Sequence, residues 1–265
     1  MKKILTLIVT AIMAVTCLFS MTACTKPDEK TLYVYTNSGF APYEYLGTDG
    51  KVIGVDIDIM NAIGEELGYK IVINDIDFEQ ILNEVQGNKN AIAAAGMTKK
   101  AERDNVATAS ISYATSVQYV IVPANTFTSD DLVDGKLAIS KLAEIDAFGV
   151  QSGTTGSFLI EDAIDEGGDL EGKEMFEYKD AIVASQDIGS TVGAVIIDKL
   201  PAKLIADNDA NLECFELDAE PESYVLYLNK EATELLSKIN QVLQKLINDG
   251  TIDQYTINHS GGSAN

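Results

Sequence analysis

Histidine and cysteine are scarce in this chain, and their scarcity excludes several kinds of site. The 265 residues include one histidine, His259, and three cysteines, Cys17, Cys24 and Cys214. No Ser/His or Cys/His set is available for nucleophilic catalysis, and no His-rich or acidic cluster suits a metal ion. The sequence also lacks the G-x₄-GK[ST] motif that binds phosphates in ATPases. We therefore expect no cofactor, no metal and no ATPase activity.

Basic residues are few as well. Lysine and arginine together number 19, against 41 aspartates and glutamates, so the formal net charge is −22. A surface this acidic repels nucleic acid, and it disfavours anionic ligands unless a local site compensates. We expect no nucleic-acid partner.

Residues 1–23 have the pattern of a secretory signal peptide. Lys2 and Lys3 precede an apolar run, which ends in small residues before Cys24. The segment 20–24, Ser-Met-Thr-Ala-Cys, resembles a bacterial lipobox, in which the cysteine becomes the lipid-carrying first residue. A plain membrane anchor is the alternative, because about 17 to 25 apolar residues can span a bilayer. We expect lipidation of Cys24, an extracytoplasmic location on the bacterial cell membrane, and a polar tether over 24–30.

A mature chain that begins at Cys24 would depend on its core for stability. With Cys17 removed and Cys24 lipidated, only Cys214 is left, so no internal disulfide can form. The formal charge would become −24, because Lys2 and Lys3 are lost without any acid.

The remaining chain alternates segments with strand and helix patterns. Asp56 suits a helix N-cap and Gly68 a helix stop, and the apolar residues between them recur at helical spacing. Strands are expected at 31–37, 69–74 and 91–95, with helices at 56–68 and 78–90. This alternation predicts a parallel, doubly wound α/β sheet.

A second α/β unit follows the first. Its strand and helix patterns lie at 132–139, 148–164, 175–180 and 192–207, and strands at 214–219 and 223–230 come next. An amphipathic helix then covers 230–248, Gly250 ends it, and the polar tail from residue 259 is expected to fray. Two units of similar size predict two lobes with a cleft between them, and such clefts favour ligand sites.

Four motifs then occur in one order along the chain. They are TNSGFAPYEY at 36–45, GMT-x₄-R at 96–103, VQSGTTGS at 150–157 and VIID at 195–198. Together they resemble the extracellular solute-binding proteins (family 3 type) of polar amino-acid ABC importers, over about residues 31 to 255. The resemblance implies a type II periplasmic-binding-protein-like fold: two doubly wound α/β lobes joined by two hinge crossings. Lobe 1 would contain 31–113 and 224–265, and lobe 2 would contain 114–223.

The resemblance also implies how the lobes would grip an α-amino acid. Its carboxylate would bind Arg103 and Thr98 in lobe 1, and Thr154 and Thr155 in lobe 2. A guanidinium suits this task because it donates two parallel charge-assisted hydrogen bonds. The ligand ammonium would bind the side chain of Asp198 and the backbone at Gly96, where the missing Cβ permits close approach.

Five further positions are expected to read the ligand side chain. By their place in the family pattern they are Asn37, Phe40, Phe78, Gln151 and Ile197. Relatives often carry an acid at the position of Asn37, where it reads a basic side chain, and Gln151 is neutral too. We therefore expect a neutral or polar amino acid.

The resemblance finally implies a partner and leaves two alternatives open. The expected protein is a monomer without catalysis, which delivers its amino acid to an ABC permease in the membrane. One alternative is a dehydratase-like enzyme on the same fold, for which Glu44 is the nearest candidate acid. The other is a sensory ligand-binding lipoprotein that works without a permease.

Overall fold

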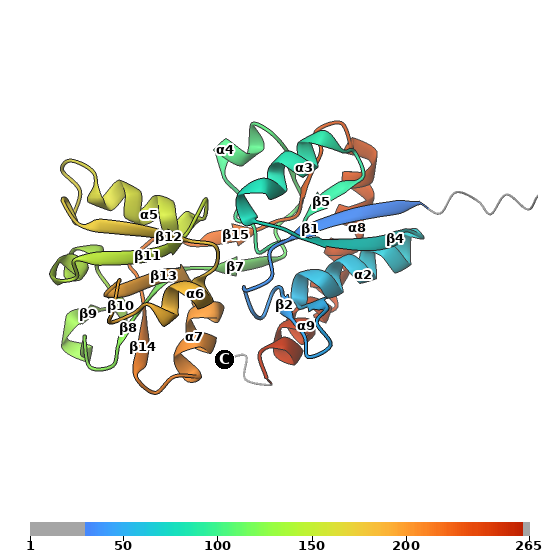
Figure 1. Ribbon diagram of the computed structural model, residues 1–265. Coiled ribbons are helices and arrows are strands. Elements are labelled where there is room, and N and C mark those ends of the chain that lie inside the picture. The colour runs from blue at the N-terminus through green and yellow to red at the C-terminus, as the bar shows by residue number, and fades with distance from the viewer. Residues whose placement is uncertain (1–29, 262–265) are drawn as a thin grey trace, which may run out of the picture. The chain divides into compact units, whose positions relative to one another are not determined.

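The computed structural model describes residues 30–261 (Figure 1). Thr31 and the residues after it form one compact unit. The expected signal peptide, Cys24 and most of the tether lie outside the described residues, as do positions 262–265. Within the described part, no helix has the length and apolar character that a membrane crossing requires.

The first sheet has the strand order β4-β1-β5-β16-β6. Its parallel centre consists of β1 (Thr31–Thr36) between β4 (Lys70–Asp75) and β5 (Ala91–Ala93). The antiparallel β16 (Tyr227–Leu228) returns from the end of the chain and lies between β5 and β6 (Thr108–Ala109). Because β16 completes the sheet, this lobe contains both an early and a late part of the sequence.

Helices cover both faces of the first sheet. On one face, α2 (Val55–Leu67), α8 (Thr233–Asn248) and α9 (Thr251–His259) contact one another. Buried side chains of α2 and α8, including Ile59, Ile63, Ile239 and Leu243, pack with Leu32 and Val34 of β1. The other face carries the 3₁₀ turn η1 (Phe78–Gln80) and α3 (Ile81–Gly87), and α4 (Ala101–Asp104) follows β5. A hairpin of β2 (Tyr45–Leu46) and β3 (Val52–Ile53) precedes α2.

The second sheet has the order β12-β11-β13-β8-β14. Its central β11 (Ala147–Gln151) is parallel to β12 (Glu174–Tyr178) and to β13 (Ala194–Asp198). The strand β8 (Gln118–Pro123) runs antiparallel to both β13 and β14 (Leu212–Glu216). Both sheets are therefore mixed, whereas the alternation of strands and helices alone predicts parallel ones.

Alternate residues of the second sheet face different helices. Val120, Phe148 and Ile196 pack with α5 (Thr155–Ile164). Tyr119, Ile121, Val195 and Ile197 pack with α6 (Ala181–Gln186) and α7 (Lys199–Asp207) on the opposite face. Both faces are covered, which explains why the strands are apolar throughout. The short elements η2 (Ser129–Asp131), β9 (Leu132–Val133), β10 (Lys136–Leu137) and η3 (Ile139–Glu144) lie beyond one end of this sheet.

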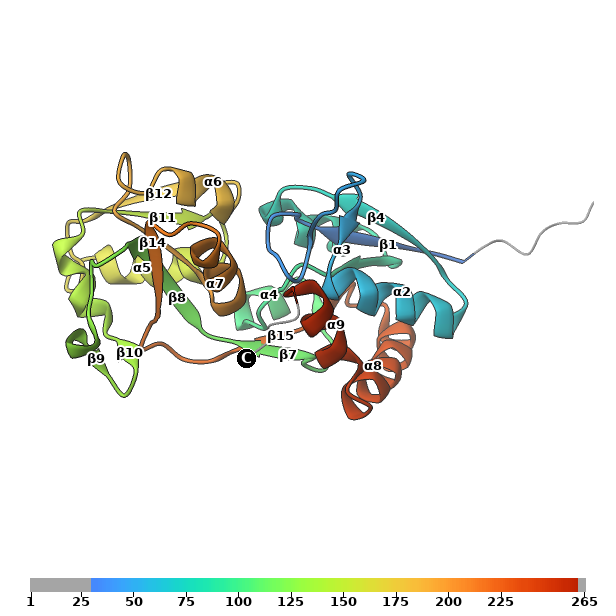
Figure 2. The same ribbon diagram turned by 90° about the horizontal axis from the view of Figure 1, so that it is seen from below.

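Two crossings join the sheets. The strands β7 (Ala114–Ser116) and β15 (Glu222–Tyr224) pair antiparallel, with Ser116 opposite Glu222 (Figure 2). Tyr224 is fully buried here and packs against the rings of Tyr43 and Phe40. The crossing is therefore continuous with the core of the first lobe.

Two expectations about local structure prove wrong. The N-cap of α2 is Gly54, not Asp56. Asp56 is buried, and its carboxylate accepts a hydrogen bond from the Gly96 N–H instead. The chain does not fray at His259, because α9 extends to that residue. The His259 ring lies 2.9 Å from the Asp58 carboxylate and 3.0 Å from the Tyr45 hydroxyl.

Gly54 permits a backbone contact that no other residue tolerates. Its φ is +138°, and a Cβ at this position would lie 2.1 Å from the carbonyl oxygen of Tyr43. Gly50 also has positive φ, but a Cβ there meets nothing within 4 Å. We expect Gly54→Ala to lower the free energy of unfolding by more than about 3 kcal/mol, and Gly50→Ala by about 1 kcal/mol. Urea unfolding measures both, and equal losses would contradict the steric argument.

Candidate functional site

A pocket between the two lobes contains most of the residues that the sequence motifs single out. Side chains fill most of it, and the space open to a water-sized molecule is about 20 Å³. Its lining residues are Asn37, Phe40, Glu44, Phe78, Ala95, Gly96, Thr98, Arg103, Gln151, Thr154, Thr155 and Asp198. The two lobes contribute to it through the carboxyl ends of β1, β5, β11 and β13, where α/β sheets bind their ligands.

Arg103 is the only arginine in the sequence, and it is buried at this pocket. It extends from α4, and its guanidinium lies over the ring of Phe78 at 5.4 Å. Its Nη1 donates to the carbonyl oxygen of Thr98 at 2.8 Å, and its Nη2 to that of Gly153 at 3.1 Å. Burial lowers the pKa of Arg103, although a guanidinium stays charged in any case. The positive charge therefore bridges the lobes through neutral carbonyls.

Gly96 brings the backbone close to the aromatic wall of the pocket. Its φ is +51°, and a Cβ would lie 2.5 Å from Phe40 Cε1. Its N–H donates to Asp56 Oδ2 at 2.9 Å, and the Tyr113 hydroxyl donates its proton to the same carboxylate, lying 2.7 Å from Oδ1 and 2.8 Å from Oδ2. Burial raises the pKa of Asp56 to about 6. Asp56 thus holds the backbone of the turn after β5 through the Gly96 N–H.

Asp198 lies at the end of β13 and faces the pocket from the second lobe. It is the N-cap of α7, but its side chain makes no capping bond. Its Oδ1 instead accepts a 2.6 Å hydrogen bond from the Tyr224 hydroxyl. Burial, followed by the negative charge of Glu222, raises the pKa of Asp198 to about 7. A positive group beside Asp198 would therefore favour its ionised form.

The Gly-Thr-Thr-Gly turn forms the start of α5. The Thr154 hydroxyl caps the helix by accepting from the Ser157 N–H at 3.3 Å. The Phe158 N–H donates to the Thr154 carbonyl. The first helical N–H groups, those of Thr155 and Gly156, have no acceptor within the helix by geometry. Thr154 and Thr155 line the pocket, so the start of α5 suits an anion.

The side-chain amides of Asn37 and Gln151 line the part of the pocket that is expected to hold the ligand side chain. Gln151 Nε2 donates to Asn37 Oδ1 at 2.8 Å and to the Lys179 carbonyl at 3.0 Å. Asn37 Nδ2 in turn donates to the Ile76 carbonyl at 2.8 Å. This pair links the two lobes and forms a neutral polar wall.

Glu44 lines the pocket although the family pattern does not place it there. It is 1% exposed, and its Oε2 has no hydrogen-bond partner among the described residues. Burial, with the charges of Asp56 and Asp198, holds its pKa well above the usual range. In the sequence Glu44 is an acid within the aromatic run APYEY, and it suggested a role only for the dehydratase-like alternative.

Ile197 does not line the pocket. It is 5% exposed and packs with Tyr119, Ile121 and Ala202 in the core below β13. The side-chain alternation of a strand explains this, because neighbouring Asp198 points to the other face. The expectation that Ile197 reads the ligand is not supported by its position.

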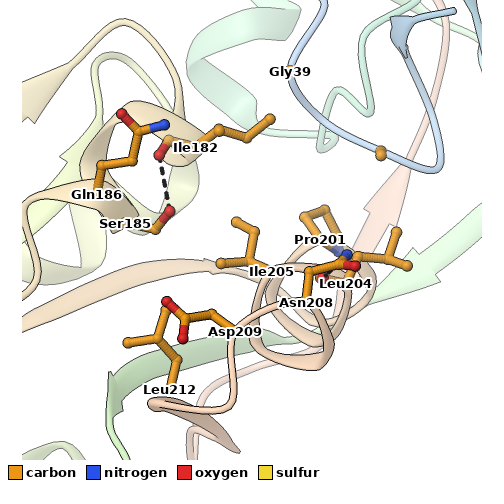
Figure 3. A pocket seen from close by; sticks show the side chains of 11 residues that line it. Gly39, Ile182, Ser185, Gln186, Pro201, Leu204, Ile205, Asn208, Asp209 and Leu212 are labelled. Carbon is orange, nitrogen blue, oxygen red and sulfur yellow. Dashed lines mark hydrogen bonds between the residues drawn. The ribbon is translucent and has the colours of Figure 1, made fainter. Parts of the chain in front are cut away.

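A larger and more apolar pocket lies beside the first. The space in it that is open to a water-sized molecule is about 330 Å³, and it is lined mainly by Gly39 and Ala41 of the first lobe and by α6 and α7 (Figure 3). Its apolar lining includes Ile182, Leu204 and Leu212, and Asp209 is its only charged residue. It lacks paired opposite charges, so the smaller pocket is the better candidate for an amino acid.

Sequence reasoning missed two polar residues beside the pocket, Gln118 and Glu222. Glu222 Oε2 accepts hydrogen bonds from the hydroxyl groups of Thr98 and Thr155, and Gln118 Nε2 donates to Glu222 Oε1 at 2.8 Å. Both residues belong to the hinge region, where no motif marks them.

Comparison with known proteins agrees with this geometry. Residues 32–261 match the bacterial extracellular solute-binding proteins, family 3. The chain belongs to this family. The arginine-binding extracellular protein ArtP of Bacillus subtilis is 26% identical to this solute-binding protein over 269 residues, 96% of each chain. The predictions of family and fold made from the four motifs are thereby confirmed.

Two solved structures have the same fold. The amino acid ABC transporter substrate-binding protein AbpA from Streptococcus pneumoniae, bound to L-arginine, is 26% identical, with a TM-score of 0.76. The match covers 89% of this chain and 96% of that one. An ancestral arginine-binding protein bound to glutamine is also 26% identical with a TM-score of 0.76, over 89% and 99% of the two chains.

The raised pKa of Asp198 predicts how stability depends on pH. Its folded pKa, about 7, exceeds the value of about 3.9 in the unfolded chain, so the folded state binds more protons between these pH values. This contribution to the free energy of unfolding is present below about pH 4 and is lost as pH rises through 7. The expected loss is on the order of 2–4 kcal/mol.

Asp198→Asn removes this contribution, so its free energy of unfolding should fall less between pH 4.5 and pH 8 than that of the wild type. Urea unfolding at the two pH values measures the difference. Asp218→Asn, at an exposed carboxylate, is the control and should keep the wild-type slope. Identical slopes for Asp198→Asn and wild type would show that the Asp198 pKa is not raised.

Proposed function

We propose that this solute-binding protein captures a free α-amino acid in the pocket between its lobes. The observation that carries the proposal is the position of Arg103 and Asp198, which face one small pocket from different lobes. A zwitterion presents an anion and a cation a few bonds apart, and the pocket offers a partner for each. Opposite charges on separate lobes also make binding favour lobe closure.

The ligand carboxylate binds Arg103. One guanidinium nitrogen donates to the Gly153 carbonyl, a neutral acceptor. A carboxylate is a stronger acceptor, and the planar fork donates to both of its oxygens. The N–H groups of Thr155 and Gly156 at the start of α5 add donors from the second lobe.

The ligand ammonium binds Asp198, which becomes ionised when the cation arrives. The backbone at Gly96 contributes to this end, because the missing side chain leaves the turn open. Leaving either charge unpaired in a buried site is unfavourable by several kcal/mol. The ion pairs therefore select molecules that carry both groups.

A neutral polar side chain is the first candidate for the rest of the ligand. The amides of Asn37 and Gln151 form an uncharged wall, and a protonated Glu44 adds no charge. The ancestral relative bound to glutamine is consistent with this choice. The second candidate is a cationic side chain, which the unpartnered Glu44 oxygen favours. Several relatives are named as arginine-binding proteins, and the structure of AbpA has L-arginine bound.

Anchoring and delivery complete the proposed function. A lipid on Cys24 would tether the protein outside the cytoplasm, and the lobes would turn about the hinge strands β7 and β15. The closed, loaded form would then be recognised by an ABC permease. Relatives are named as binding proteins, so we propose binding without catalysis.

A thermal-shift screen against all amino acids tests the ligand class. A ligand at 100 times its dissociation constant adds about 2.7 kcal/mol to the free energy of unfolding. Arg103→Lys should weaken binding of the hit about a hundredfold, because an ammonium cannot donate two parallel bonds. Isothermal titration calorimetry measures this loss, with the exposed Lys51→Gln as the control. An unchanged affinity for Arg103→Lys would remove the carboxylate role.

Glu44→Gln separates the two candidate side chains. If the ligand is neutral, Glu44 is protonated and its amide replacement should change affinity less than about threefold. If the ligand is cationic, the ionised carboxylate contributes and affinity should fall more than about tenfold. Calorimetry with glutamine and arginine in parallel distinguishes these outcomes.

A further inference from the structure

In the proposed site for the ligand carboxylate, the hydroxyl groups of two threonines bind a carboxylate of the protein itself. Glu222 Oε2 accepts hydrogen bonds from the hydroxyl of Thr98 and, at 2.8 Å, from that of Thr155. Glu222 Oε1 accepts from Gln118 Nε2, also at 2.8 Å. The residue is 9% exposed, so these bonds form in a largely dry environment.

Glu222 determines what the two threonines offer to the pocket. A hydroxyl has one proton to donate, and here both protons point to Glu222. Thr98 and Thr155 line the ligand pocket as well, and in this arrangement they present only lone pairs to it. A ligand carboxylate would meet acceptors instead of donors. The negative charge of Glu222 would also repel it.

The same contacts connect three parts of the molecule. Thr98 follows β5 in the first lobe, Thr155 begins α5 in the second lobe, and Glu222 belongs to the hinge strand β15. A single carboxylate that binds both hydroxyls holds the lobes together when no ligand is present. Two further contacts have the same effect, those from Arg103 to Gly153 and from Gln151 to Asn37.

We propose that Glu222 is a built-in substitute for the ligand carboxylate, which latches the lobes and must release Thr98 and Thr155 before an amino acid binds. This inference rests on the proposed function of the pocket. The latched form is closed but cannot accept ligand. The apparent dissociation constant therefore rises in proportion to the fraction of protein that is latched.

Glu222 also connects the two ends of the ligand site. Its charge is the second cause, after burial, of the raised pKa of Asp198. Movement of Glu222 away from the pocket therefore favours ionised Asp198. Release of the latch would free the hydroxyl groups of Thr98 and Thr155 to donate to a ligand carboxylate. The same movement would favour the ionised form of Asp198, which binds an ammonium.

Glu222→Gln tests the latch, because glutamine keeps the size of the side chain and removes its charge. We expect it to bind the amino acid found in the screen about tenfold more tightly and to associate faster than the wild type. Small-angle X-ray scattering should give a larger radius of gyration for the ligand-free variant and equal values for both loaded proteins. Asp218→Asn, an exposed acid four residues away, should behave as the wild type.

An unchanged or weaker affinity of Glu222→Gln would overturn the proposal, since a purely structural residue predicts no gain. If that variant does not fold, Glu222→Asp keeps the charge but is too short to reach both hydroxyls, and it too should bind more tightly. If the wild type binds no amino acid at all, the proposed function fails, and scattering alone decides the latch. Equal ligand-free radii for wild type and Glu222→Gln would then exclude it.

Discussion

The guanidinium of Arg103 is buried where the described residues give it no carboxylate within ion-pair distance. Its two bonds go to backbone carbonyls, one in each lobe, and Phe78 covers one face. A buried charge that is only solvated by neutral dipoles gains strongly from an anion. The position of Asp198 across the pocket limits that anion to one that carries a positive group nearby. The rest of the site follows from this pair of charges.

The acids near the pocket limit the electrostatic cost of their burial by holding protons. Burial raises the pKa of Glu44, Asp56 and Asp198, which favours their neutral forms. Tyrosine hydroxyls hold two of these acids from the aromatic core behind the hinge. An arriving ammonium would shift this balance toward ionised Asp198. Ligand binding, proton release and lobe contact are thereby linked.

The sequence predicts much of this arrangement, and the parts that it misses have physical causes. The motifs predict that Arg103, Thr98 and Asp198 belong to one site, and all three line the pocket. Asp198 ends β13, and the other two lie in the turn and the helix that follow β5, so the apolar strand patterns indicate where they lie. Ile197 does not line the pocket, because side chains alternate along β13 and Asp198 takes the side that faces the pocket. None of the four motifs covers Glu222, because its contacts with Thr98 and Thr155 depend on the pairing of β7 with β15, which lie far apart in the sequence. Helix α9 was missed, since its pattern is weakly amphipathic and its packing on α2 and α8 is tertiary.

A crystal structure of the protein with its amino acid bound tests the central claim most directly. The account predicts the ligand carboxylate on Arg103, in place of the Gly153 carbonyl, and the ligand ammonium within hydrogen-bond distance of Asp198. A ligand in the larger apolar pocket beside α6 and α7, with Arg103 still bonded to Gly153, would contradict it.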